Sequence, residues 1–95
     1  MKISEFQQQI RETYFDRDHR RGVEKNFLWF TEEVGELAEA IRKRDKTGIE
    51  EEMADVLAWL STLANLLEID LEKAVEKKYG QGCSRCQGSP CACPE

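Results

Sequence analysis

The sequence predicts an all-α protein, an antiparallel bundle of about four helices with a short cysteine-rich C-terminal tail, which oligomerises. Three observations predict this fold class. Residues 1–79 contain no proline and only three glycines, so few residues there interrupt a helix. Apolar residues recur at three- and four-residue spacing, and no segment has the two-residue alternation of a strand. Both prolines and all four cysteines follow residue 79, which divides the chain into a helical domain, 1–79, and a tail, 80–95.

The first two helices are predicted from their apolar stripes. In the first, Ile3, Phe6, Ile10 and Tyr14 share one face, and we expect this helix to end near the charged run 16–22. The second helix follows that run. Its stripe, which we expect to pack in the core, consists of Phe27, Phe30, Val34, Leu37, Ala38 and Ile41.

The third helix is expected after a turn at residues 45–47, because Thr47 and Glu50 have the spacing of an N-cap and its capping box. The short turn favours antiparallel packing of the second and third helices through their stripes. A short fourth helix is expected to begin after Asp70, a favourable N-cap residue, and to include Val75. The stripe of the third helix consists of Ile49, Met53, Val56, Leu57, Leu60, Leu63, Ala64 and Leu67.

The composition restricts the partners and the location of the chain. Its formal net charge is -5 and 35% of its residues are charged, so repulsion excludes a general binder of nucleic-acid polymers or anionic membrane surfaces. No apolar run approaches the roughly 18–20 residues that span a bilayer. No signal-peptide segment follows Met1, so we expect a cytoplasmic protein. A chain of 95 residues has a thin core, which favours association with copies of itself into an oligomer.

Two acidic segments border the apolar stripes of the second and third helices. Glu33 and Glu36 lie about 60° apart on one helical face, and Glu52 and Asp55 repeat this spacing. If the two helices pack together, the four carboxylates converge, which is unfavourable unless a cation lies among them. Oxygen ligands without histidine or cysteine favour Mg²⁺ or Mn²⁺. The alternative is a solvated acidic surface without a metal.

The same acids have the pattern of a known family. The two segments Glu32-Glu33-Val34-Gly35-Glu36-Leu37 and Glu52-Met53-Ala54-Asp55-Val56-Leu57 resemble the EExxE and ExxD motifs of the MazG-type, all-α nucleoside triphosphate pyrophosphohydrolases. Fifteen residues separate the two motifs, within the range of this family, and the likeness covers most of residues 1–79. The resemblance implies a four-helix unit that dimerises, often further into tetramers. It also implies Mg²⁺-dependent cleavage of a (deoxy)nucleoside triphosphate between the α and β phosphates, which yields a monophosphate and pyrophosphate.

The resemblance also implies roles for individual residues. The positions that match the family's metal ligands are Glu33, Glu36, Glu52 and Asp55. Glu32 completes the acidic set, as the catalytic base that orients water or as a residue behind the ligands. Many relatives have a lysine, matched here by Lys78, and four residues later an asparagine, both of which help to bind the phosphates. This chain departs from them at the second position, which is Gly82.

Two other functions remain open from the sequence. Phosphoribosyl-ATP pyrophosphohydrolase of histidine biosynthesis is similar in fold and acid pattern. That branch tends to have Tyr-His after its second acidic block, where this chain has Ala58-Trp59. A non-catalytic helical interaction module with a zinc-binding tail is the alternative of a different class. It predicts weak cation binding at the acids and no release of pyrophosphate.

Aromatic and basic residues are further candidates for contact with a nucleotide. Trp29 and Trp59 have faces on which a base can stack, and Trp59, one turn after Asp55, is the better candidate. The alternative for both is packing in the core or in a dimer interface. His19 is expected on the surface. A solvated loop, or contact with substrate phosphates across a dimer, is expected for Arg17, Arg20, Arg21 and Lys25.

The tail has a spacing that suits a metal. Cys83 and Cys86 form a Cys-x-x-Cys pair, and Cys91 and Cys93 follow after four residues. Four thiolates can complete a tetrahedral structural zinc site, which would make the tail a small zinc knuckle. Disulfides and free thiols are the alternatives. We expect any cross-link in the tail to be structural or to gate the nearby site, and not to perform hydrolysis.

Overall fold

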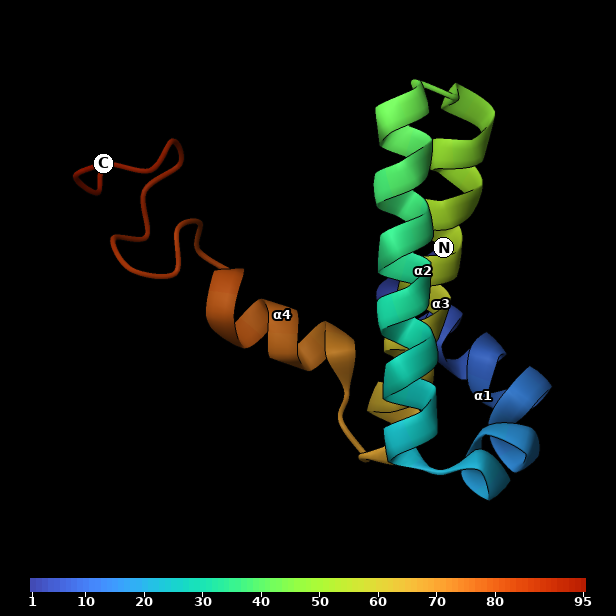
Figure 1. The fold of residues 1–95 in the computed structure, drawn as a ribbon. Coiled ribbons are helices and arrows are strands. Elements are labelled where there is room, and N and C mark those ends of the chain that lie inside the picture. Colours follow the sequence, from blue (N-terminus) through green and yellow to red (C-terminus); the bar gives the residue numbers. More distant parts are fainter.

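The computed structural model describes all 95 residues and is all-helical, with four helices and no strand (Figure 1). The helices are α1 (Ile3–Arg21), α2 (Val23–Lys43), α3 (Lys46–Leu66) and α4 (Leu71–Tyr79). The predicted all-α class and the number of helices are therefore confirmed, and the cysteines lie in a C-terminal segment without helix. None of the helices combines the length and the apolar character that a membrane crossing requires.

α1 includes the charged run in its last turns and ends only at Gly22, where the backbone turns to a φ of 89°. The N–H of Gly22 donates to the carbonyl oxygen of Asp18 at 3.0 Å, which closes the final turn. The expectation of a loop for the basic residues of this run is wrong, because Arg17, Arg20 and Arg21 are helical. This segment continues as helix because its Asp18 packs against α3. Asp18 lies on the same helical face as Tyr14, is buried, and accepts a hydrogen bond from Thr62 of α3.

α2 ends at Arg44, which adopts a left-handed backbone with a φ of 55°. α3 begins directly afterwards, because the Asp45 side chain accepts a hydrogen bond from the N–H of Gly48 at 3.2 Å. The prediction that Thr47 is the N-cap is therefore wrong. Asp45, an equally favourable cap residue, precedes it and places Thr47 inside the first turn.

The start of α4 agrees with the sequence prediction. The Asp70 side chain accepts a hydrogen bond from the N–H of Lys73 at 3.0 Å, so Asp70 is the N-cap. Gln7 of α1 holds the preceding turn, because its amide donates to the Ile69 carbonyl at 2.8 Å and accepts from the N–H of Leu71 at 3.0 Å. These bonds fix the start of α4 beside α1.

The helices are arranged around a close pair (Figure 1). The chain reverses at the short connection after α2, and α3 runs back beside α2 for most of its length. α1 packs mainly against α3. α4 projects away from the α2–α3 pair and leads into the tail.

The core of one chain is small, and its buried apolar residues are Ile10, Ala40, Leu63 and Ala64. The expectation that the apolar stripe of α2 packs in the core is wrong for one chain. Phe27, Val34 and Ile41 keep 52%, 43% and 51% of their surface exposed. The reason is that α2 faces α3 with the side that bears Trp29 and the acids, so the opposite side meets no other helix.

Candidate active site

Three carboxylates from two helices form the centre of the candidate site. Glu33 and Glu36 of α2 and Glu52 of α3 each offer an oxygen, and these oxygens lie within 4.8 Å of one another. The i,i+3 spacing places the two α2 acids on one face, and the packing of α2 on α3 brings Glu52 opposite them. We call these three residues the carboxylate group.

The carboxylate group is short of hydrogen-bond donors. Neither Glu33 Oε2 nor Glu52 Oε2, both buried atoms, has a hydrogen-bond partner. Two half-buried carboxylates at this distance need a shared proton or a cation between them. The chemistry of these atoms therefore suits a positive ion that accepts oxygen ligands.

The pKa values of the group reflect the same conflict. Burial, followed by interactions with Glu52, Glu36 and Asp55, raises the pKa of Glu33 to about 7. The neighbouring Glu33 side chain lowers the pKa of Glu52, but burial and the charges of Glu36 and Asp55 outweigh this effect, so the net direction of the pKa shift is upward. Near neutral pH the group therefore holds a proton that a cation could displace.

Asp55 and Glu32, the other two acids of the pattern, lie outside this group. Asp55 is exposed on α3, one turn after Glu52, and its charge reaches both Glu33 and Glu52. Asp55 also lines a neighbouring cavity, so it lies between the carboxylate group and that cavity. Glu32 is exposed on α2 beside Glu33 and does not join the three carboxylates.

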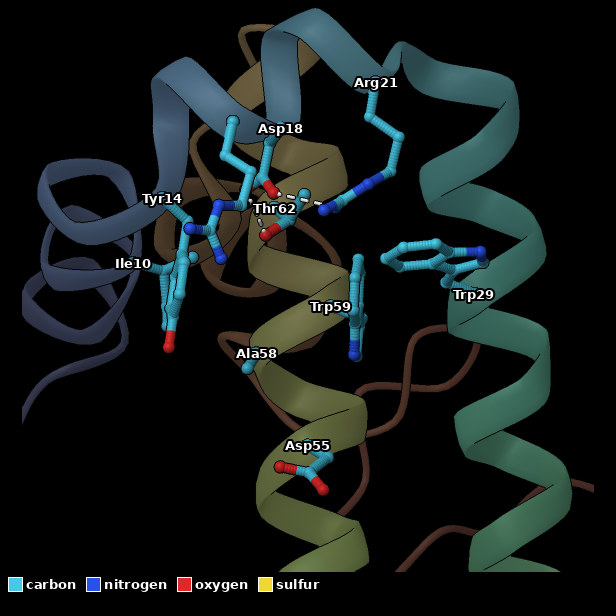
Figure 2. Close-up of a pocket in the computed structure, with 10 residues that line it drawn as sticks. Ile10, Tyr14, Asp18, Arg21, Trp29, Asp55, Ala58, Trp59 and Thr62 are labelled. Atoms are coloured by element: carbon cyan, nitrogen blue, oxygen red, sulfur yellow. Dashed lines mark hydrogen bonds and ion pairs between the residues drawn. The ribbon is translucent and has the colours of Figure 1, made fainter.

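An aromatic cavity of about 270 Å³, whose lining residues are drawn in Figure 2, includes Asp55, the acid whose charge reaches the carboxylate group. Trp29 of α2 and Trp59 of α3 meet edge to face in it, with ring centroids 5.5 Å apart. The guanidinium carbon of Arg21 lies 4.1 Å from the ring centroid of Trp29 and 5.4 Å from that of Trp59. The residues that line the cavity are Ile10, Tyr14, Arg17, Asp18, Arg21, Trp29, Asp55, Ala58, Trp59 and Thr62. The cavity thus combines aromatic surface with two arginines and several other polar groups.

A buried polar network holds one wall of the cavity. Asp18 accepts from Arg21 at 3.2 Å through Oδ1 and from the Thr62 hydroxyl at 2.8 Å through Oδ2 (Figure 2). Arg21 also donates to the Asn26 side chain at 2.8 Å. Asn26, fully buried, donates in turn to the backbone carbonyls of Asp18 and Gly22. The network fixes the Arg21 guanidinium over the two tryptophans.

Sequence reasoning missed this network, because Asp18 lies in a charged run that is typical of a solvated surface. One signal could have revealed it. Ile10, Tyr14 and Asp18 follow one another at four-residue spacing, so an acid continues the apolar face of α1. A carboxylate on such a face needs a partner from the same chain. His19, in contrast, is exposed as expected and stacks on Phe15.

Two predicted groups lie apart from the α2–α3 acids within one chain. Lys78 is on α4, where its Nζ lies 5.6 Å from the ring centroid of Tyr79. α4 and the tail, with its four cysteines, project away from the α2–α3 pair (Figure 1). The structure therefore does not bring Lys78 to the carboxylate group in a single chain.

A comparison with protein families matches residues 21–86 to the MazG nucleotide pyrophosphohydrolase domain. The matched segment is more than two thirds of the chain. The chain belongs to the MazG nucleotide pyrophosphohydrolase family. The resemblance seen in the two acidic motifs is thereby confirmed. The chain matches no curated protein sequence.

The extent of the MazG match agrees with the position of the site. It includes the carboxylate group, Asp55 and both tryptophans, and it begins at Arg21, the arginine that lies over the two tryptophans. α1 before Arg21, which supplies Asp18, lies outside it. At the other end the match continues through α4 to Cys86 in the tail. Membership of the MazG family indicates nucleotide pyrophosphohydrolase activity in general.

Proposed function

We propose that this chain is a Mg²⁺-dependent pyrophosphohydrolase that cleaves a (deoxy)nucleoside triphosphate between the α and β phosphates, giving a nucleoside monophosphate and pyrophosphate. The observation that carries the proposal is the pair of buried, unpartnered oxygens of Glu33 and Glu52 within the carboxylate group. A phosphate-binding protein has no use for converging negative charges unless a cation reverses their sign.

The donor set fits a hard divalent cation. Glu33, Glu36 and Glu52 would hold Mg²⁺ or Mn²⁺, and Asp55, one turn away, would complete the set after a side-chain rotation. When bound, such an ion neutralises phosphate charge and makes a water molecule more acidic near neutral pH. The carboxylates would hold this ion on the side of the site where Asp55 lines the aromatic cavity.

The aromatic cavity is proposed to receive the nucleobase. Its volume of about 270 Å³ lies just below the usual range for ligand pockets, which suits a base alone and leaves sugar and phosphates outside. Trp59, beside Asp55, and Trp29 offer the stacking surface. Asp55 lies between base and carboxylate group, so the triphosphate would extend from the cavity toward the cation.

Glu32 is proposed as the residue that orients or deprotonates the attacking water. It is exposed and lies next to Glu33 along α2, so its carboxylate is free to face a water outside the metal ligands. For this role, the α phosphate of the substrate must bind on the solvent-exposed side of the carboxylate group, within reach of a water beside Glu32.

A homodimer or homotetramer is proposed as the active assembly. Exposed apolar residues of α2 and α3, among them Phe27, Leu28, Ile41 and Met53, would lose contact with water in it. A second chain could also bring its own α4 close to the site, which would give Lys78 the phosphate contact that one chain does not provide.

The test is a pyrophosphate-release screen over standard and modified nucleoside triphosphates with Mg²⁺, and with phosphoribosyl-ATP in the panel. We expect Glu36→Gln to reduce the rate about 100-fold or more, since it removes one charge from the ion's ligands. Glu50→Gln is the matched control, because Glu50 is exposed on α3 and takes no part in the carboxylate group. Its rate should equal that of wild type.

Two results of this screen would contradict the proposal. If wild type and Glu36→Gln are equally inert with every nucleotide, the helical interaction module is the better explanation. If phosphoribosyl-ATP alone releases pyrophosphate, the reaction class stands but the substrate is that of the histidine pathway.

A further inference from the structure

We propose that the tail binds one zinc ion through the four thiolates of Cys83, Cys86, Cys91 and Cys93, at a site separate from the carboxylate group. The four Sγ atoms, which we call the thiol cluster, all lie within 4.8 Å of one another. The cluster arises within sixteen residues that contain no helix.

The sulfur positions fit one tetrahedral ion. The Sγ of Cys91 lies 3.5 Å from that of Cys83 and 4.0 Å from that of Cys86, and Cys83 lies 3.7 Å from Cys93. A tetrahedral ion with Zn–S distances of about 2.3 Å places its sulfurs about 3.8 Å apart. Disulfides would instead sort the sulfurs into two separate pairs. Here Cys83 and Cys91 each have two sulfur neighbours, which indicates a single centre.

Backbone donors surround the cluster in the manner expected for anionic sulfur. The Sγ of Cys86 accepts from the N–H of Gly88 at 3.4 Å and from that of Ala92 at 3.3 Å. Cys83 and Cys91 accept from the N–H groups two residues after them, at 3.4 and 3.3 Å. A neutral thiol is a weak acceptor, whereas hydrogen bonds of this kind support thiolates that ligate a metal.

The loop between the two cysteine pairs is shaped by close backbone contacts. The N–H of Cys83 donates to the Gly88 carbonyl at 3.0 Å, and the N–H of Gln87 donates to the Cys83 carbonyl at 2.8 Å. A Cβ at Gly82 would lie 2.8 Å from the Gln87 carbonyl oxygen, and one at Gly88 would lie 2.8 Å from that of Pro90. Both positions therefore require glycine for the chain to wrap the sulfurs this closely.

The zinc would stabilise the folded conformation of the tail, which has no hydrophobic core. None of residues 80–95 is buried, so no hydrophobic core holds this segment in shape. A tetrathiolate zinc site can provide that free energy, because the metal binds the folded loop and not the open one. The cluster lies beyond α4, away from the α2–α3 acids (Figure 1), so this ion would be structural.

The experiment uses the full chain, purified under reducing conditions, loaded with zinc and dialysed. We expect one zinc per chain by elemental analysis, and replacement by Co²⁺ should give the intense visible absorption of a tetrahedral sulfur site. Cys86→Ser and Cys91→Ser should lose the bound metal. Ser84→Ala, within the same loop, and Glu36→Gln, in the carboxylate group, should both retain it.

A second measurement does not depend on metal content. Arg85 is the only lysine or arginine in residues 80–95, so trypsin can cut the tail at one position. Zinc should protect the bond after Arg85, and a zinc chelator or Cys86→Ser should expose it. Retention of zinc by both cysteine variants, two disulfides in the reduced preparation, or mononuclear iron in place of zinc would each overturn the proposal.

Discussion

The carboxylate group and the thiol cluster are two ligand sets of opposite construction. The carboxylate group is assembled from two helices whose packing forces like charges together, and it leaves Glu33 and Glu52 with unpartnered oxygens. The thiol cluster is assembled by one short segment whose own N–H groups donate to three of its four sulfurs. Carboxylate oxygens on two packed helices suit Mg²⁺, a hard ion that can exchange during the reaction. Thiolates on one loop suit Zn²⁺, which would remain bound as a structural ion.

The two ligand sets differ in how much of the fold each one needs. The carboxylate group needs the α2–α3 pair and the network at Asp18 that holds the adjoining cavity. The thiol cluster needs only its loop, since none of its residues is buried against the helices. The two sites should therefore respond independently to metal removal, mutation and pH.

The largest effect is expected from removing each metal separately. Without Mg²⁺, pyrophosphate release should fall to background while the bond after Arg85 stays protected from trypsin. With a zinc-selective chelator, that bond should become sensitive while the rate with Mg²⁺ stays the same. Rates and proteolysis are measured on one preparation. A rate that falls together with zinc content would show that the two sites are coupled.

Asp18→Ala tests the support of the helical site. This change leaves the Arg21 guanidinium, whose side chain is 16% exposed, without its carboxylate partner, and it also removes the acceptor of Thr62. We expect the free energy of unfolding to fall by about 3 kcal/mol, measured by urea denaturation. Asp16→Ala, at an exposed position, is the control and should have little effect. Zinc content should be unchanged in both variants.

The raised pKa of Glu33 predicts how the stability of the Mg²⁺-free protein depends on pH. The folded chain holds this proton up to about pH 7, whereas the unfolded chain releases it near the ordinary value of 4.5. Between pH 4.5 and about pH 7 the folded state thus binds more protons than the unfolded state. The free energy of unfolding should therefore decrease as the pH rises through this range. Thermal unfolding at pH 6 and pH 8 without Mg²⁺ measures this.

Two controls sharpen the pH experiment. Glu33→Gln should flatten the dependence, and added Mg²⁺ should restore stability at pH 8. A stability that increases between pH 6 and pH 8 in the Mg²⁺-free wild type would contradict the assignment of the proton to the carboxylate group.

The smallest effect is expected from one methyl group in the tail. At Gly88 a Cβ would lie 2.8 Å from the Pro90 carbonyl oxygen and 3.3 Å from the Cys86 sulfur. We expect Gly88→Ala to weaken zinc binding about tenfold, measured by competition with a chromogenic chelator. Gly35→Ala is the control, because a Cβ there meets nothing within 4 Å. Equal zinc affinity in the two variants would show that the loop tolerates a wider geometry.

Much of the local structure was predictable from the sequence. The absence of proline before residue 80 and the apolar periodicity indicated four helices, and Asp70 indicated the start of α4. The N-cap of α3 was misplaced because Asp45 and Thr47 are both acceptable caps, and the choice between them depends on how the preceding helix ends. Local preferences alone do not resolve such a tie.

The sequence by itself determined the helices, the acidic motifs and the spacing of the cysteines, because these follow from neighbours along the chain. Only the tertiary structure decided that α2 turns its acids toward α3, that Asp18 is buried with Arg21 as its partner, and that Lys78 lies away from the carboxylates. The physical reason is that burial and the distance between charges depend on which helices meet. That is a property of the packed chain and not of any segment.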